Sequence, residues 1–317
     1  MSVRKILVTG ATGKQGSAVV NALVASPPPY PYEIIALTRN TDAPAAKELA
    51  AKSKTITLLA GDMNDCPSIF SKAGGNGSIW GVFSMQLPAM QQKKVAEDIE
   101  EKQGIALIDA ALSSGVKHFV YTSVDRGGSN SINDPTNIPH FVSKHKIELH
   151  LIAATKDSTK NPQGMTYTIL RPTAFFDNLT PDFVGKGFAA MWNNMGSVPL
   201  QLVGTKDIGI FAAMAFSNLD SNPDTYSNKA ISLAGDELTQ PEASKVFEKV
   251  FSKKMPITFG FVGSMIQYMV KELGTMFQWF VDVGYKADIA ENKRLNPKMQ
   301  DFETWLREES KFGDKKR

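Results

Sequence analysis

One stretch near the start of the chain decides the fold: Val8-Thr9-Gly10-Ala11-Thr12-Gly13-Lys14-Gln15-Gly16. The run Lys5 to Thr9 predicts a strand that leads into it, and Ser17 to Ala25 predicts a helix that leaves it. Three glycines spaced G-x-x-G-x-x-G at such a strand–helix turn are typical of a dinucleotide-binding Rossmann unit. Gly10 would permit the tight turn, Gly13 the close approach of a pyrophosphate, and Gly16 the packing of helix on strand. A glycine-rich turn that binds nothing is the alternative.

Strand and helix patterns alternate outward from this turn through the first half of the chain. Further parallel strands are expected at Glu33 to Thr38, Thr55 to Leu59, Gly81 to Met85, His118 to Thr122 and Thr166 to Leu170. The helices between them are expected at Ala43 to Lys52, Ser68 to Ala73 and about Gln91 to Ser114. Such alternation predicts an α/β fold with right-handed crossovers and a doubly wound parallel Rossmann sheet.

The second half of the chain loses this alternation and gains Phe, Met, Trp and Gly. Helices are expected at Pro241 to Phe251, Ile266 to Val283 and Asp301 to Lys311. We therefore assign residues 1–172 to the Rossmann domain and residues 173–317 to a smaller C-terminal α+β subdomain for a substrate or partner. A late strand near residues 230–234 is a candidate to complete the sheet. Charged residues interrupt the apolar segment Ile257 to Val283, so we expect a buried or groove-lining helix pair rather than a membrane span.

Composition excludes few function classes. The chain has 317 residues and a formal charge of +3, which gives no reason to expect direct nucleic-acid binding. Cys66 is the single cysteine, and the first residues show no apolar signal sequence, so we expect a cytoplasmic protein, with the nucleus as the alternative. His140, His145 and His150 lie five residues apart, a spacing that does not gather them on one helix face, so no metal site is expected.

The end of the second strand indicates which dinucleotide is bound. An NAD site usually places an acidic side chain there, whereas this strand ends in Arg39 and Asn40. A guanidinium suits a 2′-phosphate, and Asp42 lies too far along the loop to replace it, so the pattern favours NADP. A solvated loop arginine is the alternative. Asp62, followed by Met63, closes the third strand and is expected at the adenine edge or, alternatively, as a helix N-cap.

Several longer motifs resemble those of the NmrA-like family of atypical short-chain dehydrogenases/reductases. They are VTGATGKQG (8–16), LTRN (37–40), YTSVDRGG (121–128), HFVSKHKIE (140–148), RPTAFFDN (171–178) and RLNP (294–297). The resemblance spans nearly the full chain. It implies a Rossmann domain, a small C-terminal subdomain, and NADP(H) bound across the carboxyl edge of the sheet.

The resemblance also exposes a departure from the catalytic pattern. Catalytic short-chain dehydrogenases pair a tyrosine with a lysine four residues later, and this chain has His140 in place of the tyrosine but keeps Lys144. An imidazole is shorter than a phenol and titrates several pH units lower, so His140 cannot simply take over proton donation. Lys144 would then bind a ribose hydroxyl or, as in isoflavone-reductase-like enzymes, act as a general base; a solvated helix lysine is the alternative. His140 and Lys144 are the candidate catalytic residues.

The remaining family positions are expected around the same cofactor. For Phe175 and Phe176 the alternative is an ordinary place in the core, and for Lys102 the alternative is a solvated helix face. Ser123 and Asp125 are expected to face a substrate. The expected cofactor contacts, taken together, are Gly10, Thr12, Gly13, Lys14, Gln15, Gly16, Arg39, Asp62, Met63, Met85, Gln86, Leu87, Lys102, Lys144, Phe175, Phe176 and Asn178.

Two function classes follow. In the first, NADP(H) occupancy changes the surface shown to a protein partner, which makes the protein a redox-responsive regulator. In the second, the protein is an NADPH-dependent oxidoreductase that reduces a small apolar or aromatic molecule. The residues expected to enclose such a substrate are Phe175, Phe176, Met191, Trp192 and Phe261.

Overall fold

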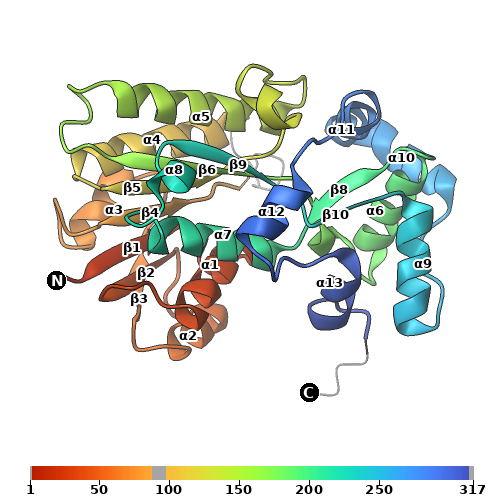
Figure 1. Cartoon of the computed structure of the whole chain (residues 1–317), viewed down its shortest axis with the longest axis horizontal. Helices are drawn as coiled ribbons and strands as arrows, with labels where there is room; N and C mark the ends of the chain where they lie inside the picture. Colours follow the sequence, from red (N-terminus) through yellow and green to blue (C-terminus); the bar gives the residue numbers. More distant parts are fainter. Residues whose placement is uncertain (1, 88–97, 314–317) are drawn as a thin grey trace. The chain divides into compact units, whose positions relative to one another are not determined.

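Seven strands form one sheet in the order β3-β2-β1-β4-β5-β6-β9 (Figure 1) in a computed structural model that describes residues 2–87 and 98–313. All the pairs from β3 across to β6 are parallel. The predicted doubly wound α/β fold is therefore confirmed. The strands are β1 (Arg4–Val8), β2 (Tyr32–Thr38), β3 (Ile56–Ala60), β4 (Gly81–Ser84), β5 (His118–Thr122), β6 (Thr166–Pro172) and β9 (Lys229–Leu233).

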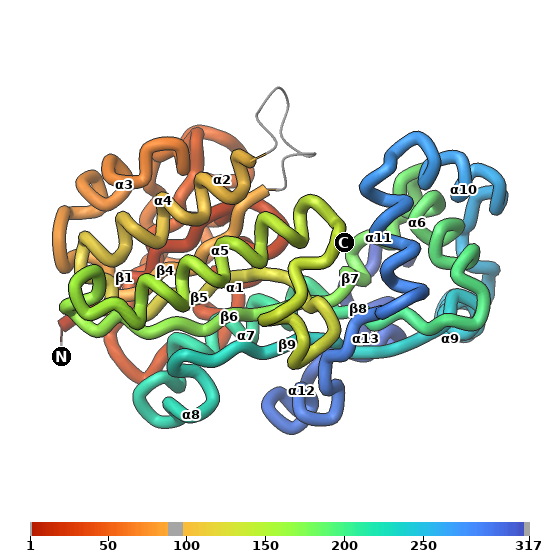
Figure 2. The backbone as a smooth tube through the Cα atoms, turned by 90° about the horizontal axis from the view of Figure 1, so that it is seen from above, coloured from red at the N-terminus to blue at the C-terminus, as the bar shows by residue number. Residues whose placement is uncertain are grey.

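The central strands are apolar because helices cover both faces of the sheet. Ile6, Leu7 and Val8 of β1 are all fully buried. The helices that cover the sheet are α1 (Lys14–Ala25), α2 (Pro44–Ala51), α3 (Cys66–Lys72), α4 (Ile99–Ser113), α5 (Pro139–Lys156) and α7 (Thr205–Ser217). Figures 1 and 2 show α4 and α5 side by side along one face, with α1 and α7 on the other.

Glycines allow these helix pairs to approach closely. A Cβ on Gly104 of α4 would lie 2.5 Å from Ile147 Cδ1 of α5, and a Cβ on Gly209 of α7 would lie 2.4 Å from the carbonyl carbon of Ala18 in α1. Each face of the sheet therefore carries a tightly packed helix pair. The helix expected at about 91–114 begins at Ile99 in the described chain, and residues 91–97 lie outside the described residues.

The chain divides into two compact units whose segments are interleaved. The first comprises residues 1–123, 140–171 and 208–231, and the second comprises 124–139, 172–207 and 232–317. One of the points where the chain passes between them lies between Arg171 and Pro172, and the division into domains at 172/173 stays a prediction.

The second unit contains a small sheet of its own, in the order β10-β8-β7, where β7 and β8 are parallel and β8 and β10 antiparallel. Its strands are β7 (Ala174–Phe175), β8 (Leu200–Val203) and β10 (Asp236–Leu238). Its helices are α6 (Phe183–Asn193), α9 (Gln240–Phe251), α10 (Gly260–Met269), α11 (Lys271–Asp282), α12 (Ile289–Leu295) and α13 (Phe302–Glu308).

The apolar segment at 257–283 forms two helices, of which only α11 buries large apolar side chains. Phe277, Trp279 and Phe280 of α11 are buried, whereas Phe261 and Tyr268 of α10 are 70% and 86% exposed. Of the two expectations for this pair, burial or lining a groove, burial is wrong for α10, because that helix carries apolar residues on both faces and only one face packs on α6. None of the helices in the described ranges is long and apolar enough to cross a membrane.

A buried carboxylate ties the start of α7 to the C-terminal segment within the second unit. Asp207 is fully buried and accepts hydrogen bonds from Asn296 Nδ2 at 3.2 Å and from the Gln300 backbone N–H at 3.2 Å. Removal from water raises the pKa of Asp207 from 3.8 to about 7, because burial disfavours the charged form.

This pKa predicts a pH-dependent stability. Between pH 4 and 7 the folded chain holds a proton on Asp207 that the unfolded chain releases, so its stabilisation is complete below about pH 4 and is lost as the pH rises through about 7. The unfolding free energy should fall by on the order of 4 kcal/mol over this pH range. Asp207→Asn should therefore flatten the pH dependence of the unfolding free energy, measured in urea from pH 4 to 8. The exposed Asp224→Asn is the control, and equal slopes for the unmodified chain and Asp207→Asn would contradict this assignment.

Candidate functional site

The backbone of the β1–α1 turn is built around two of its glycines. Gly10 has φ +58°, a left-handed conformation that favours glycine, and its carbonyl accepts a hydrogen bond from the Gly13 N–H at 2.8 Å. A Cβ on Gly16 would lie only 2.2 Å from the Gly10 carbonyl oxygen. Gly13 is less confined, since the nearest atom to its Cβ position is the Gly10 oxygen at 3.2 Å. Gly10 and Gly16 thus shape the turn, while Gly13 faces the open side.

The first turn of α1 is left open to an anion. Its N-cap is Gly13, no side chain of the described residues caps it, and its first turn contains no acidic residue. An Asp or Thr side chain caps each of α3, α6, α9, α12 and α13, whereas no described side chain caps α2, α4, α10 or α11. What sets α1 apart from those four helices is the glycine turn that precedes it. Free N–H groups at a helix start form a binding site for phosphate.

The strands beside the turn are fixed to one another at the same edge. The Thr9 hydroxyl donates to the Met85 carbonyl at 3.0 Å and accepts from the Met85 N–H at 2.8 Å, which joins the ends of β1 and β4. The Met85 side chain lies over the turn, with Cε 3.8 Å from the Cβ position of Gly13. Gln86 is buried and donates to the Ser84 hydroxyl, while Leu87 is 41% exposed.

Arg39 follows β2 with its guanidinium exposed and makes no ion pair with the rest of residues 2–87 and 98–313. The acid closest in sequence, Asp42, is occupied elsewhere: its carboxylate pairs with Lys47 at 3.0 Å, and its N–H donates to the Asn40 side chain. The loop thus keeps the charge of Arg39 available at the end of β2.

Other predicted contacts lie at the surface of this edge. Asp62 is exposed and accepts from the Asn64 N–H at 2.9 Å, whereas Asp65 caps α3. The alternative of a helix cap at Asp62 is therefore wrong, because the helix begins one turn later. Lys102 pairs with Asp98 at 2.7 Å on an exposed face of α4, which matches its alternative reading as a solvated helix lysine. Met63 is half-buried beside Asp62.

Lys144 is buried in a polar network at the carboxyl end of β5. Its Nζ lies 3.1 Å from Glu100 Oε1 and 3.4 Å from the Thr122 carbonyl oxygen. The Thr122 hydroxyl in turn donates to Gln15 Oε1 at 2.7 Å. The network therefore connects α4, α5 and β5 with the first turn of α1. Lys144 is not a solvated helix lysine, and sequence reasoning missed Glu100, since an acid in the first turn of a helix is common.

The other residues expected near a substrate have structural surroundings. The half-buried His140 ring packs edge-on against Phe141 at 4.7 Å. Asp125 is fully buried, and its carboxylate accepts hydrogen bonds from five donors, so it cannot face a substrate as expected. The donors are the N–H groups of Gly127, Gly128 and Lys286 and the hydroxyls of Ser131 and Ser232.

The aromatic residues expected over the nicotinamide lie in the second unit. Phe176 is fully buried, with its ring 5.5 Å from Phe302 and 5.6 Å from Trp305, so its surroundings match the alternative of a core aromatic. Phe175 and Asn178 are half-buried. Met191 and Trp192 are also buried, while Phe261 is exposed.

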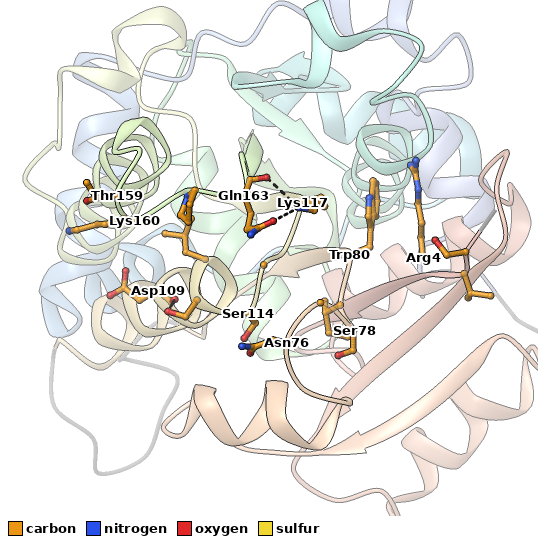
Figure 3. Close-up of a pocket in the computed structure, with 18 residues that line it drawn as sticks. Arg4, Asn76, Ser78, Trp80, Asp109, Ser114, Lys117, Thr159, Lys160 and Gln163 are labelled. Carbon is orange, nitrogen blue, oxygen red and sulfur yellow. Dashed lines mark hydrogen bonds between the residues drawn. The ribbon is translucent and has the colours of Figure 1, made fainter.

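A separate groove of about 1030 Å³ lies at the opposite edge of the sheet, where the strands begin (Figure 3). Two of its cations already have partners. Arg4 pairs with Asp220 at 2.8 Å and lies over the Tyr30 ring, and Lys117 donates to Gln163 Oε1 at 3.1 Å. Ligands of open α/β sheets bind at the carboxyl edge instead. In the described ranges, no group of three or more His, Cys, Asp or Glu residues could hold a metal ion.

Known proteins resemble this chain in sequence and in fold. A family model described as the NmrA-like family matches residues 2–306. An NmrA-like family domain-containing oxidoreductase of Aspergillus hancockii is 27% identical over 270 residues, covering 80% of this chain and 74% of that protein. The Escherichia coli NADPH-dependent quinone oxidoreductase, solved with NADPH, has a TM-score of 0.68 at 19% identity, covering 95% of this chain and 97% of that one. NmrA, a negative transcriptional regulator solved with NADP, has a TM-score of 0.65 at 16% identity, covering 97% and 95%.

The glycine geometry predicts different outcomes for two alanine substitutions. Gly16→Ala should lower the unfolding free energy by about 1–3 kcal/mol, because its Cβ would overlap the Gly10 carbonyl and force the helix from the strand. Gly13→Ala should cost clearly less, since its Cβ needs only a small adjustment. Chemical denaturation of both variants checks this, and equal losses of stability would show that the Gly10–Gly16 contact is not limiting.

Proposed function

This chain belongs to the NmrA-like family, and from that premise we propose that it binds NADP(H) at the carboxyl edge of its sheet and acts as a redox-responsive regulator. The observation that carries the cofactor assignment is the uncapped start of α1 behind the glycine turn. Its N–H groups and the helix dipole suit a pyrophosphate. The solved neighbours named for NADPH and NADP complexes support the same cofactor class.

Arg39 favours NADP(H) over NAD(H). Its guanidinium is exposed at the end of β2, and Lys47 neutralises the only acid of the following loop, Asp42. A planar guanidinium can donate two parallel hydrogen bonds to a 2′-phosphate and stack on adenine.

The surroundings of Lys144 favour a regulator over a carbonyl reductase. The ammonium contacts Glu100 and the Thr122 carbonyl, so a carboxylate already compensates its charge. The position four residues earlier is His140, and Tyr121 is fully buried, so neither supplies the phenol of the usual tyrosine–lysine pair. Bound NADP(H) would then act by favouring one surface conformation over another, limited by its differential affinity for the two. We expect a protein partner and a reducing compartment, cytoplasm or nucleus, because Cys66 has no second cysteine to pair with.

An NADPH-dependent oxidoreductase is the second candidate. The observation that favours it is the uncharged, exposed face of α10, with Phe261, Tyr268 and Met269, which could pack on a small aromatic molecule. A quinone accepts a hydride and can take its proton from water, so such an acceptor would not need the missing tyrosine. The relatives named as oxidoreductases support this alternative.

Cofactor preference tests the assignment of Arg39. The unmodified chain should bind NADPH at least about tenfold more tightly than NADH, since charge-assisted contacts to the extra phosphate contribute about 1.5–3 kcal/mol. Arg39→Ala should remove most of this preference, and Lys54→Ala, which changes an exposed lysine ahead of β3, should not. Gly13→Val, whose side chain would fill the pyrophosphate space, is the non-binding control. Calorimetric titration gives the affinities, and equal affinities in the unmodified chain would rule out the NADP assignment.

Turnover separates the two function classes. We expect no oxidation of NADPH above background when the protein is mixed with quinones, aldehydes or enones, followed by absorbance of the reduced nicotinamide. A regulator binds the cofactor without consuming it. Robust oxidation that depends on one of these acceptors and falls by about 10²–10⁴ in Lys144→Ala would identify a reductase instead.

A further inference from the structure

Glu100 is a buried acid whose role in dinucleotide binding the proposed function does not assign. It is 1% exposed in the first turn of α4, and neither carboxylate oxygen accepts a hydrogen bond from the described residues. Its compensating partner is the Lys144 ammonium, 3.1 Å away on α5. An uncompensated buried carboxylate costs several kcal/mol, so the pair behaves as one unit.

Stability alone does not account for this pair. Replacing a buried ion pair with apolar residues of similar volume is often neutral or even stabilising. The same two helices also carry the pair Glu101–Lys146, at 2.9 Å, with the lysine side chain 54% exposed. An exposed pair of this kind already joins α4 to α5, although it contributes little to stability. The buried pair is set apart by its place at the carboxyl end of β5, where ligands of such sheets bind.

The contacts of Lys144 fix where its ammonium lies. Nζ lies at the ion-pair distance of 3.1 Å from Glu100 Oε1 and donates a hydrogen bond to the Thr122 carbonyl at 3.4 Å. The lysine side chain remains 11% exposed while that of Glu100 is 1% exposed, so the lysine is the member of the pair that a ligand can reach. Without Glu100, a long flexible lysine would adopt many rotamers, and ordering it would reduce the binding free energy.

We propose that Glu100 is a positioning residue for dinucleotide binding: it holds the Lys144 ammonium at the end of β5, where the ammonium can donate to a ribose hydroxyl of NADP(H). This inference rests on the proposed function. Through Thr122, which donates to Gln15 at 2.7 Å, the same network reaches the first turn of α1. Glu100 therefore contributes to affinity through Lys144 and does not itself touch the cofactor.

A double-mutant cycle on the full chain tests this role, with the NADPH dissociation constant measured by calorimetry. Glu100→Gln should weaken NADPH binding by about five- to tenfold, because the ammonium loses the charge that orients it. Lys144→Met should weaken binding at least as much. In the Lys144→Met background, Glu100→Gln should have no further effect, since a positioning residue without its lysine has nothing to position.

Glu101→Gln is the matched control, because it breaks the exposed pair on the same helices and should leave NADPH affinity unchanged. An unchanged affinity in Glu100→Gln would overturn the inference, and so would an equal loss with and without Lys144. If Glu100→Gln does not fold, Glu100→Asp keeps the charge but shortens the side chain by one methylene. It should weaken NADPH binding with a native circular dichroism spectrum, and unmodified affinity in that variant would also overturn the role. Failure of the unmodified chain to bind NADPH would instead refute the proposed function and the inference together.

Discussion

The close approach of Gly16 to the Gly10 carbonyl is the constraint on which the rest of the first unit depends. Because a Cβ at residue 16 would lie 2.2 Å from that oxygen, α1 can pack against the end of β1 only with glycine there. This contact directs the uncapped start of α1 to the edge where β1, β4 and β5 end. Thr9 then joins the ends of β1 and β4, and Thr122 joins β5 to Gln15. A backbone contact thus places the uncapped start of α1 at the edge where the buried Lys144 also lies.

Helix α5 adds the charged groups of this edge. It carries two buried ion pairs, Lys144 with Glu100 of α4 and Glu148 with Arg171 of β6, where the guanidinium Nη2 lies 2.7 Å from the carboxylate. Each pair joins α5 to a different element. Buried charges of this kind hold geometry well, because loss of either partner leaves the other uncompensated. A site built this way suits binding of a charged cofactor, whereas proton transfer requires a group that can readily gain or lose a proton.

Features that depend on neighbours in sequence could be predicted, and features that depend on distant residues could not. Strands such as β1 are buried on both faces, so their apolar runs stand out, and the glycine turn is contained in nine residues. The partnership of Glu100 with Lys144 spans two helices and leaves no local pattern. Asp125 follows a strand as a substrate-facing residue would, yet two of its five donors, Ser232 and Lys286, come from distant segments. Phe176 likewise resembles a cofactor contact until its packing on Phe302 and Trp305 is known.

The interleaving of the two units bears on how the chain can fold during synthesis. The strand β6 ends at Pro172, but its outer neighbour β9 does not begin until Lys229. Until the ribosome has released that later segment, the backbone N–H and C=O groups on the outer side of β6 have no strand to pair with. Unpaired strand edges are prone to join other chains. The nascent protein therefore passes through a stage at which a chaperone would have a clear target, and a fragment truncated after β6 would carry that exposed edge permanently.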